Sequence, residues 1–271
     1  MYDYNDIWDL VSHVFCRGTE VERPYSFSSQ EDSENGREFE RVAGNELCNI
    51  ALRQHGSLFS NLYVSREQRN SISQIDHVLL LADRLIVVEC KDYGGLVDCT
   101  SLVSRDGKPY WKQVTKSGEI HYLYSPVAQN QVHVSAIGEV TNVSVRKCYS
   151  LVLFSNRSKL LHVPEITASV AVLQLASLHT LDFRPIPSRL FSSIKYNGIL
   201  RKLEQCVNVD PDIVHKHRSI ANTLSSTRPK ISAPTVCPRC GSALVLRYVP
   251  SKFLGCSMYP LCDYTYSLGD D

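Results

Sequence analysis

QIDHVLL at residues 74–80 and LIVVECK at residues 85–91 are two apolar runs separated by a short polar break, a pattern that predicts neighbouring antiparallel β-strands. Side chains alternate across a strand, so Glu89 and Lys91 share one face while Cys90 points to the packed side. Asp76 joins that face if the two runs pair. The sequence therefore predicts two carboxylates and a lysine gathered on one surface of a buried sheet.

These three residue types suit metal-dependent phosphodiester hydrolysis. Two neighbouring carboxylates repel each other unless a cation lies between them, and oxygen ligands suit a hard divalent ion such as Mg²⁺ or Mn²⁺. A nearby lysine can orient the attacking water and stabilise charge on a phosphate. Asp76 and Glu89 are thus candidate Mg²⁺ ligands, and Lys91 is a candidate catalytic residue. The alternative from spacing alone is a strand end with solvated charges, because an acid-x-lysine triplet also arises by chance.

The same strands, extended to VVECKDYGG at residues 87–95, resemble the signature of the nuclease-related domain, or NERD. That family is placed in the PD-(D/E)xK restriction-endonuclease-like superfamily. The resemblance implies an α/β fold with a mixed sheet flanked by helices. It also implies a DNA nuclease in which Asp76 and Glu89 bind the metal and Lys91 assists the attacking water.

Two further segments carry the resemblance. GREFERVA at residues 36–43 resembles the opening helix of the family, and SPVAQN at residues 125–130 resembles the entry to a second helix. Through these matches, the resemblance implies Glu40 and Gln129 as additional catalytic candidates. It covers roughly residues 36–180.

Four cysteines lie close together near the C-terminus, with CPRCG at residues 237–241 followed by Cys256 and Cys262. Four thiolates at this spacing predict a closed tetrahedral Zn²⁺ site formed by Cys237, Cys240, Cys256 and Cys262. Such a short segment buries too little apolar surface to fold alone, so the metal supplies its folding energy. The site is expected to be structural, because four sulfur ligands leave no open position for catalysis.

CPRCGS at residues 237–242 and FLGCSMYPLCDY at residues 253–264 resemble the zinc ribbon at the C-terminus of bacterial type I DNA topoisomerases, which is associated with single-stranded DNA. Cationic and aromatic side chains alternate through the segment and could pair with phosphates and stack on bases. The alternative for each aromatic residue is packing over the zinc knuckles. The candidate nucleic-acid-binding residues are Arg239, Arg247, Tyr248, Lys252, Phe253 and Tyr259.

Composition sets the domain organisation. The chain has 271 residues, 43% of them hydrophobic, which suits one principal domain with a small appendage. Its net charge of +1 conceals an acidic leader, since residues 1–40 hold ten acidic and three basic side chains. We expect an acidic N-terminal helix and loop (1–35), a NERD domain (36–180), a helical segment and linker (181–235) and a zinc ribbon (236–268).

A coarse reading gives helices at 37–54 and 126–140, strands at 58–64, 75–81, 85–91, 94–99, 149–154 and 168–173, and mainly helix over 188–224. A polar, glycine-containing excursion through Asp106-Gly107 and Ser117-Gly118 is expected to lead to Ser125-Pro126. The histidine at position 77 is expected to be partly exposed. Buried free thiols are expected at the six cysteines outside the ribbon, which are Cys16, Cys48, Cys90, Cys99, Cys148 and Cys206.

Two functions from different classes follow. The first is a Mg²⁺-dependent deoxyribonuclease whose ribbon binds single-stranded or distorted DNA, in DNA repair or in defence against foreign DNA. The second is a non-cleaving DNA-binding or adaptor protein that keeps the nuclease fold. No run is apolar enough to cross a membrane, so a cytoplasmic protein is expected. DNA versus RNA, cleavage mode and oligomeric state stay open.

Overall fold

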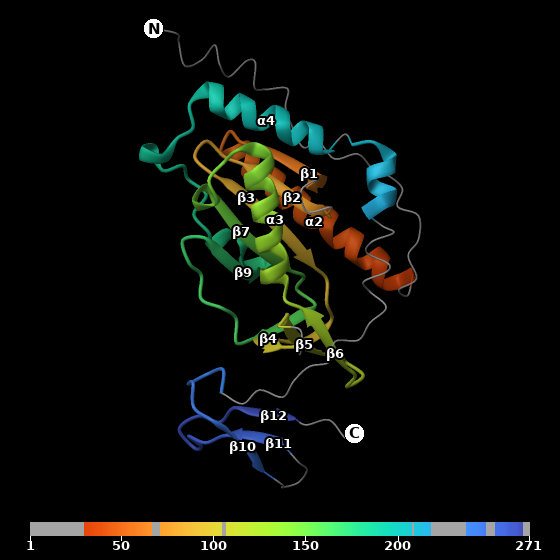
Figure 1. Ribbon diagram of the computed structural model, residues 1–271, viewed down its shortest axis with the longest axis vertical. Coiled ribbons are helices and arrows are strands. Elements are labelled where there is room, and N and C mark those ends of the chain that lie inside the picture. Colours follow the sequence, from red (N-terminus) through yellow and green to blue (C-terminus); the bar gives the residue numbers. More distant parts are fainter. Residues whose placement is uncertain are drawn as a thin grey trace. The chain divides into compact units, whose positions relative to one another are not determined.

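The structure is a computed structural model, and it describes residues 30–66, 71–104, 107–207, 209–217, 237–247 and 253–267 (Figure 1). The described chain divides into two compact units. The first contains the residues up to Gly94 together with 126–159 and 164–217, and the second contains 95–125, 160–163 and the C-terminal residues.

The first unit is built on a mixed five-stranded sheet with the order β1-β2-β3-β7-β9. The strands β1, β2 and β3 pair antiparallel, whereas β3, β7 and β9 are parallel. This is the predicted mixed sheet with flanking helices. Its strands are β1 (Ser57–Arg66), β2 (Ser71–Leu80), β3 (Leu85–Lys91), β7 (Cys148–Phe154) and β9 (Val170–Gln174).

Helices cover both faces of this sheet. On one face, α2 (Gln30–Arg53) packs Phe39, Ala43 and Leu47 against Leu79 and other apolar strand residues. On the other face, α3 (Pro126–Thr141) and α4 (Ser193–Val207) form a second core with Val78, Val87 and their neighbours. Each strand residue thus packs on one of two helical layers, as expected for a sheet buried on both sides.

The helix α2 is longer than the sequence predicted. It was expected at 37–54 after a loop, but it begins at Gln30. Its end agrees with the prediction: His55 takes a positive φ of 51°, and the Gly56 N–H donates to the Ala51 carbonyl oxygen at 2.8 Å. This is the hydrogen bond that closes a Schellman C-cap.

The polar excursion of the sequence is folded into strands. In the second unit, β4 (Gly95–Val103), β5 (Pro109–Val114) and β6 (Ile120–Tyr124) form a sheet with β8 (Ser158–Leu161) in the order β6-β5-β4-β8. The sequence predicted a strand at 94–99, which overlaps β4, but it did not predict β5 and β6. Trp111 and Gln113 are buried on alternate positions of β5, a two-residue period that the surrounding polar residues obscured.

A glycine holds the start of this sheet. Gly95 has a φ of 84°, and a Cβ there would lie 2.3 Å from the Val114 carbonyl oxygen. No L-residue with a side chain fits that approach. The Gly94-Gly95 pair, which ends the segment at residues 87–95 that resembles the nuclease-related domain, therefore lies where the chain leaves β3 and enters the antiparallel sheet.

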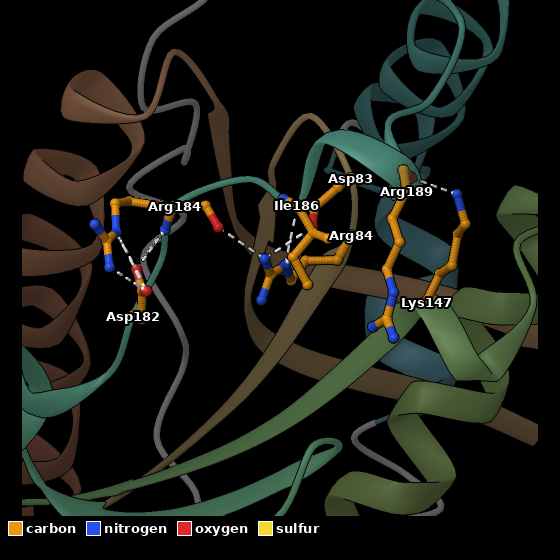
Figure 2. A network of polar contacts seen from close by, with 7 residues as sticks. All are labelled: Asp83, Arg84, Lys147, Asp182, Arg184, Ile186 and Arg189. Carbon is orange, nitrogen blue, oxygen red and sulfur yellow. Dashed lines mark hydrogen bonds and ion pairs between the residues drawn. The ribbon is translucent and has the colours of Figure 1, made fainter.

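The segment that precedes α4 is held in place by polar contacts of its backbone and side chains. Figure 2 shows Arg84 between the Asp83 carboxylate and the Arg184 carbonyl oxygen, at 3.0 and 2.9 Å. The Ile186 N–H donates to Asp83 at 3.1 Å, and Lys147 donates to the Arg189 carbonyl oxygen at 2.7 Å. The prediction of mainly helix over 188–224 is confirmed for its described part, which contains the end of the short 3-10 helix η4 (Pro187–Arg189), the helix α4 and a helix at 211–217.

The second unit also holds the ribbon strands β10 (Leu244–Arg247), β11 (Phe253–Cys256) and β12 (Thr265–Ser267), which form an antiparallel sheet. The remaining short elements are the 3-10 helices η2 (Val145–Lys147) and η3 (Leu175–Thr180).

Several expectations about single residues are settled by the fold. Cys90, Cys99, Cys148 and Cys206 are buried free thiols, as predicted. Cys48 is disulfide-bonded, so the expectation of a free thiol was wrong there. Cys16, the N-terminal helix and the linker 225–235 lie outside the described residues. Among the described helices, none combines the length and apolar character needed to cross a bilayer.

Candidate functional site

The β2–β3 pairing brings the two predicted metal ligands together. His77 pairs with Val88 and Leu80 with Leu85, so the next position along the register sets Asp76 against Glu89. The Asp76 carboxylate oxygen Oδ2 accepts a hydrogen bond of 2.8 Å from the Cys90 N–H. Asp76 thus bonds to the backbone of the strand that carries Glu89 and Lys91.

A break in the β1–β2 ladder allows this orientation. The paired residues run from Ser60 and His77 to Leu62 and Ile75, and they skip Asn61 and Asp76. Asn61 takes a positive φ of 55°, which asparagine tolerates better than most residues. Val78 and Ile75 pack in the same core although strict alternation would place them on opposite faces. The break therefore lies at Asp76 itself.

Glu89 and Lys91 form a buried ion pair. The Lys91 Nζ lies 2.5 Å from Glu89 Oε1, and the two side chains are 16% and 3% exposed. Burial acts to raise the pKa of Glu89, but Lys91 and His133 outweigh it, so that pKa is lowered. Burial likewise opposes charge on Lys91, but the Glu89 carboxylate raises its pKa above the ordinary value. Both groups are therefore charged at neutral pH.

Asp76 is in the opposite position. Burial, together with the charges of Glu89 and Glu40, raises the pKa of Asp76 well above its usual range. A carboxyl group in this environment binds a proton more tightly. A cation placed between Asp76 and Glu89 would also relieve the repulsion between the two carboxylates. A positive charge bound beside Asp76 and Glu89 would therefore be electrostatically favourable.

Glu40 approaches from α2, on the other face of the sheet, near enough for its charge to act on Asp76. His77 links this helix to the strands: its Nε2–H donates to the Glu40 carbonyl oxygen at 3.0 Å, and its Nδ1 accepts from the Ser60 hydroxyl at 2.8 Å. His77 is 4% exposed, so the expectation of a partly exposed histidine was wrong.

The helix α3 supplies His133, a residue that the sequence reasoning missed. His133 Nδ1 lies 3.2 Å from Glu89 Oε2, and both side chains are buried. The contact lacks aligned hydrogen-bond geometry, so Glu89 Oε2 is a buried oxygen without a hydrogen-bond partner. Gln129 is half-buried one turn earlier on the same helix face. The four-residue spacing from Gln129 is the signal that could have identified His133.

Asn130 fixes α3 against the sheet. Its Nδ2 group lies within 2.9 Å of the Val87 carbonyl oxygen and of the Ser150 hydroxyl, and 3.2 Å from the Leu151 carbonyl oxygen. These acceptors belong to the parallel strands β3 and β7. Asn130 therefore sets the height of α3 along the strands and, with it, the contact between His133 and Glu89.

The predicted zinc ligands converge. The Sγ atoms of Cys237, Cys240, Cys256 and Cys262 all lie within 4.8 Å of one another. Cys237 and Cys262 are 3.7 Å apart and Cys240 and Cys256 are 3.4 Å apart, close to the ~3.8 Å edge of a tetrahedron with Zn–S bonds of about 2.3 Å. Gly241 turns the knuckle with a φ of 73°. The donor set therefore fits Zn²⁺.

Three of the predicted nucleic-acid-binding residues are neighbours, because Arg247 pairs with Phe253 across β10 and β11 and also contacts Tyr259. Arg247 lies over the ring of Tyr259 at 5.6 Å, and Tyr259 is 64% exposed. Phe253 is half-buried. Arg239 is already engaged by Asp263 and by His162 Nε2, which lies 3.1 Å from its Nε. Tyr248 and Lys252 lie outside the described residues.

Comparisons with known proteins agree with this geometry. Residues 35–155 match the family model of the nuclease-related domain, and residues 235–271 match that of the topoisomerase DNA binding C4 zinc finger. The chain therefore contains a nuclease-related domain over residues 35–155. More specifically, it joins that domain to a C-terminal zinc ribbon of the topoisomerase type.

Two individual proteins are similar in part. DNA topoisomerase 1 of Methanocaldococcus jannaschii is 42% identical over 86 residues, which span 30% of this chain and 11% of the topoisomerase. The solved structure of Can2 from Sulfobacillus thermosulfidooxidans, in complex with cyclic tetra-adenylate, is 17% identical over 76% of this chain and 46% of that chain. The TM-score of this match is 0.30.

Proposed function

We propose that this protein is a metal-dependent DNA nuclease that hydrolyses phosphodiester bonds, and that its ribbon binds single-stranded or distorted DNA. One observation carries the proposal. Glu89 is buried and ionised with an oxygen that has no hydrogen-bond partner, beside Asp76, whose pKa is raised by burial and by neighbouring acids. Burying such a pair is costly unless a ligand uses it.

The residues fit a hard divalent cation. Asp76 and Glu89 offer carboxylate oxygens from adjacent strands, and the unpartnered Glu89 Oε2 is available as a donor atom. When bound there, Mg²⁺ or Mn²⁺ would polarise the scissile phosphate and lower the pKa of water. Glu40 supplies further negative charge beside Asp76.

Lys91 acts as a hydrogen-bond donor and not as a base. Its pKa is raised by the Glu89 carboxylate, so it keeps its proton at neutral pH. A protonated amine 2.5 Å from Glu89 can donate to the attacking water or to a phosphate oxygen that gains negative charge. Gln129, on the helix face that also carries His133, is the remaining polar candidate for contact with substrate or water.

His133 positions Glu89. Its imidazole lies 3.2 Å from Oε2 and leaves the Lys91 amine as the partner of Oε1. The two contacts involve different oxygens of the carboxylate and limit its rotation. Outer residues of this kind orient ligating groups and are sensitive positions in metal sites.

The ribbon supports a role in holding DNA. Tyr259 presents an exposed ring, and Arg247 lies over it, so a base can stack while a phosphate pairs with the guanidinium. The family model that matches this segment is a DNA-binding one. A preference for single strands follows from stacking, since paired bases do not present their faces.

The test compares the wild-type protein with Asp76→Ala, Glu89→Ala and Lys91→Ala on labelled single- and double-stranded DNA, with and without Mg²⁺ or Mn²⁺. We expect the two acid variants to abolish metal-dependent cleavage and Lys91→Ala to reduce it severely, with DNA binding largely kept. Glu46→Ala, an exposed acid on α2, is the matched control. Equal cleavage by all variants would indicate another site, and no cleavage by the wild type would favour a non-cleaving DNA-binding protein.

A further inference from the structure

The end of β3 meets the end of β7 at one edge of the sheet. These strands are parallel, Lys91 pairs with Phe154, and the Ser155 N–H donates to the Lys91 carbonyl oxygen at 3.0 Å. Residues that directly follow the two strands therefore lie at the same carboxyl edge. In α/β proteins with parallel strands, this edge is where ligands bind.

An arginine and an aspartate meet at this edge. Asp92 follows Lys91 directly, Arg157 follows β7, and Arg157 Nη1 lies 2.8 Å from Asp92 Oδ2. The aspartate side chain is 4% exposed, whereas the arginine side chain is 55% exposed. The guanidinium also lies over the chain at Gly94, with its Nη2 3.8 Å from the place of a Cβ. A buried acid thus holds an exposed guanidinium in one position.

This arrangement is not that of an ordinary surface pair. The Arg184–Asp182 pair shown in Figure 2 also has a distance of 2.8 Å, but its side chains are 81% and 62% exposed, and the residues are two apart in sequence. Exposed pairs of that kind contribute little. Asp92, in contrast, is buried, and its Oδ1 has no hydrogen-bond partner, which costs free energy that the single contact with Arg157 offsets only in part.

The charges around this edge of the sheet are mostly negative, so the positive charge of Arg157 can attract a phosphate there. Asp76, Glu89, Glu40 and Asp92 are acidic, and Lys91 is already bound to Glu89. A phosphodiester that approaches this edge is repelled unless further positive charge meets it. Arg157 donates one N–H, from Nη1, to the Asp92 carboxylate, and its planar guanidinium leaves other N–H groups for a phosphate.

We infer that Arg157, oriented by the buried carboxylate of Asp92, binds a backbone phosphate of the nucleic acid next to the bond that is cleaved. The inference rests on the proposed nuclease function for its substrate class. In it, Arg157 is the phosphate-binding residue, and Asp92 is a positioning residue that does not touch DNA. Together they set where the strand lies relative to Lys91.

Binding without added divalent cations tests the inference apart from cleavage. The probe is fluorescein-labelled oligothymidine of about 20 nucleotides, titrated with the full-length protein at several salt concentrations. We expect Arg157→Ala to weaken binding about fivefold and to reduce the slope of log K against log salt by about 0.7, the loss of one phosphate contact on a single strand. Arg157→Lys keeps the charge but loses the fork, and should retain the slope with intermediate affinity.

Two further variants separate positioning from net charge. Arg184→Ala removes the same charge from an exposed pair, and affinity should stay within about twofold because salt screens distant charges. Asp92→Ala makes the protein more positive, so net charge alone predicts tighter binding. If Asp92 positions Arg157, binding weakens instead, and Asp92→Asn, which can still accept from the guanidinium, recovers most of the affinity. Thermal unfolding confirms that each variant is folded.

Equal effects of Arg157→Ala and Arg184→Ala, or tighter binding by Asp92→Ala, would overturn the inference. Cleavage assays with Mg²⁺ distinguish it from the proposed function. If neither the wild type nor any variant cleaves DNA, but Arg157→Ala still binds DNA more weakly than the wild type, the nuclease proposal fails and the phosphate site stands. If the wild type cleaves and Arg157→Ala matches it in KM and in affinity, the phosphate site fails alone.

Discussion

The proposed nuclease centre and the four-cysteine cluster are both candidate metal sites, but they depend on the rest of the chain in different ways. Glu40, Asp76, Glu89 and His133 come from α2, β2, β3 and α3, and two large apolar cores hold those elements. The cysteines come from one short segment whose core, among the described residues, consists of Cys237, Cys256 and Tyr264 with a few half-buried neighbours.

The difference shows where the folding free energy of each site originates. At the nuclease centre, apolar burial holds charged groups together against their repulsion, so the fold does not need the cation. At the ribbon, the apolar core is too small, and the zinc–sulfur bonds supply the stability. Removing a ligand should therefore unfold the ribbon but only inactivate the nuclease centre.

The largest expected effect is the loss of zinc. Cys256→Ser should abolish Zn²⁺ binding, worth about 10 kcal/mol or more for structural sites, and should unfold the ribbon. The thermal transition of the first unit should be unchanged. Zinc content and the tyrosine near-UV signal would show both results. Ser257→Ala, an exposed neighbour, should keep one zinc per chain. A stable ribbon without zinc would remove the contrast between the two sites.

The next effect concerns the residue that holds α3 on the sheet. Asn130→Ala removes the contacts to Val87, Ser150 and Leu151 and leaves buried acceptors unpaired, so the free energy of unfolding should fall by roughly 2–3 kcal/mol. Urea unfolding measures this directly. Gln131→Ala changes an exposed position on the same helix and should have little effect. A neutral Asn130→Ala would mean that packing alone sets the position of α3.

A smaller effect is expected at His133. His133→Ala leaves Glu89 without its second contact, and metal-dependent cleavage should fall about 10- to 100-fold, the usual range for residues that orient a ligand. Zinc content and affinity for single-stranded DNA should be unchanged. Val132→Ala, at an exposed neighbouring position, serves as the control. Cleavage at the wild-type rate would exclude His133 from the site.

The smallest effect is a gain in stability. The raised pKa of Asp76 means that the folded state holds its proton more tightly than the unfolded chain, so stability falls as pH rises from about 4 through the folded pKa. Asp76→Asn removes this loss and keeps an oxygen for the Cys90 N–H. Without divalent cations it should be more stable than the wild type by roughly 1 kcal/mol at pH 8, with no gain at pH 4. Equal stability at both pH values would contradict the shift.

The sequence predicted those features that depend on interactions between residues close together in the chain. The β2–β3 pair, the end of α2, the start of α3 and the four cysteines all follow from local periodicity, capping or spacing. It did not predict β5 and β6, because only Trp111 and Gln113 mark their buried face.

The missed site residues share one cause. His133 meets Glu89 and Asn130 meets Val87 across more than 40 residues of chain, and Arg157 meets Asp92 across 65. Buried His77 depends on Glu40, which lies 37 residues earlier. No local pattern encodes such contacts, since a polar residue on a helix or turn looks the same whether solvent or a carboxylate faces it. Only the register of β3 with β7 and the height of α3 decide between these outcomes.

The connectivity of the sheet also has a kinetic consequence. Consecutive hairpins join β1, β2 and β3. In contrast, β7 pairs with β3 although β4–β6 and α3 separate the two strands in the sequence. Low contact order favours early formation, so the acid pair should be assembled in the folding transition state before α3 covers it. We expect core substitutions in the β2–β3 hairpin to slow folding, and those in β9 or α3 chiefly to accelerate unfolding.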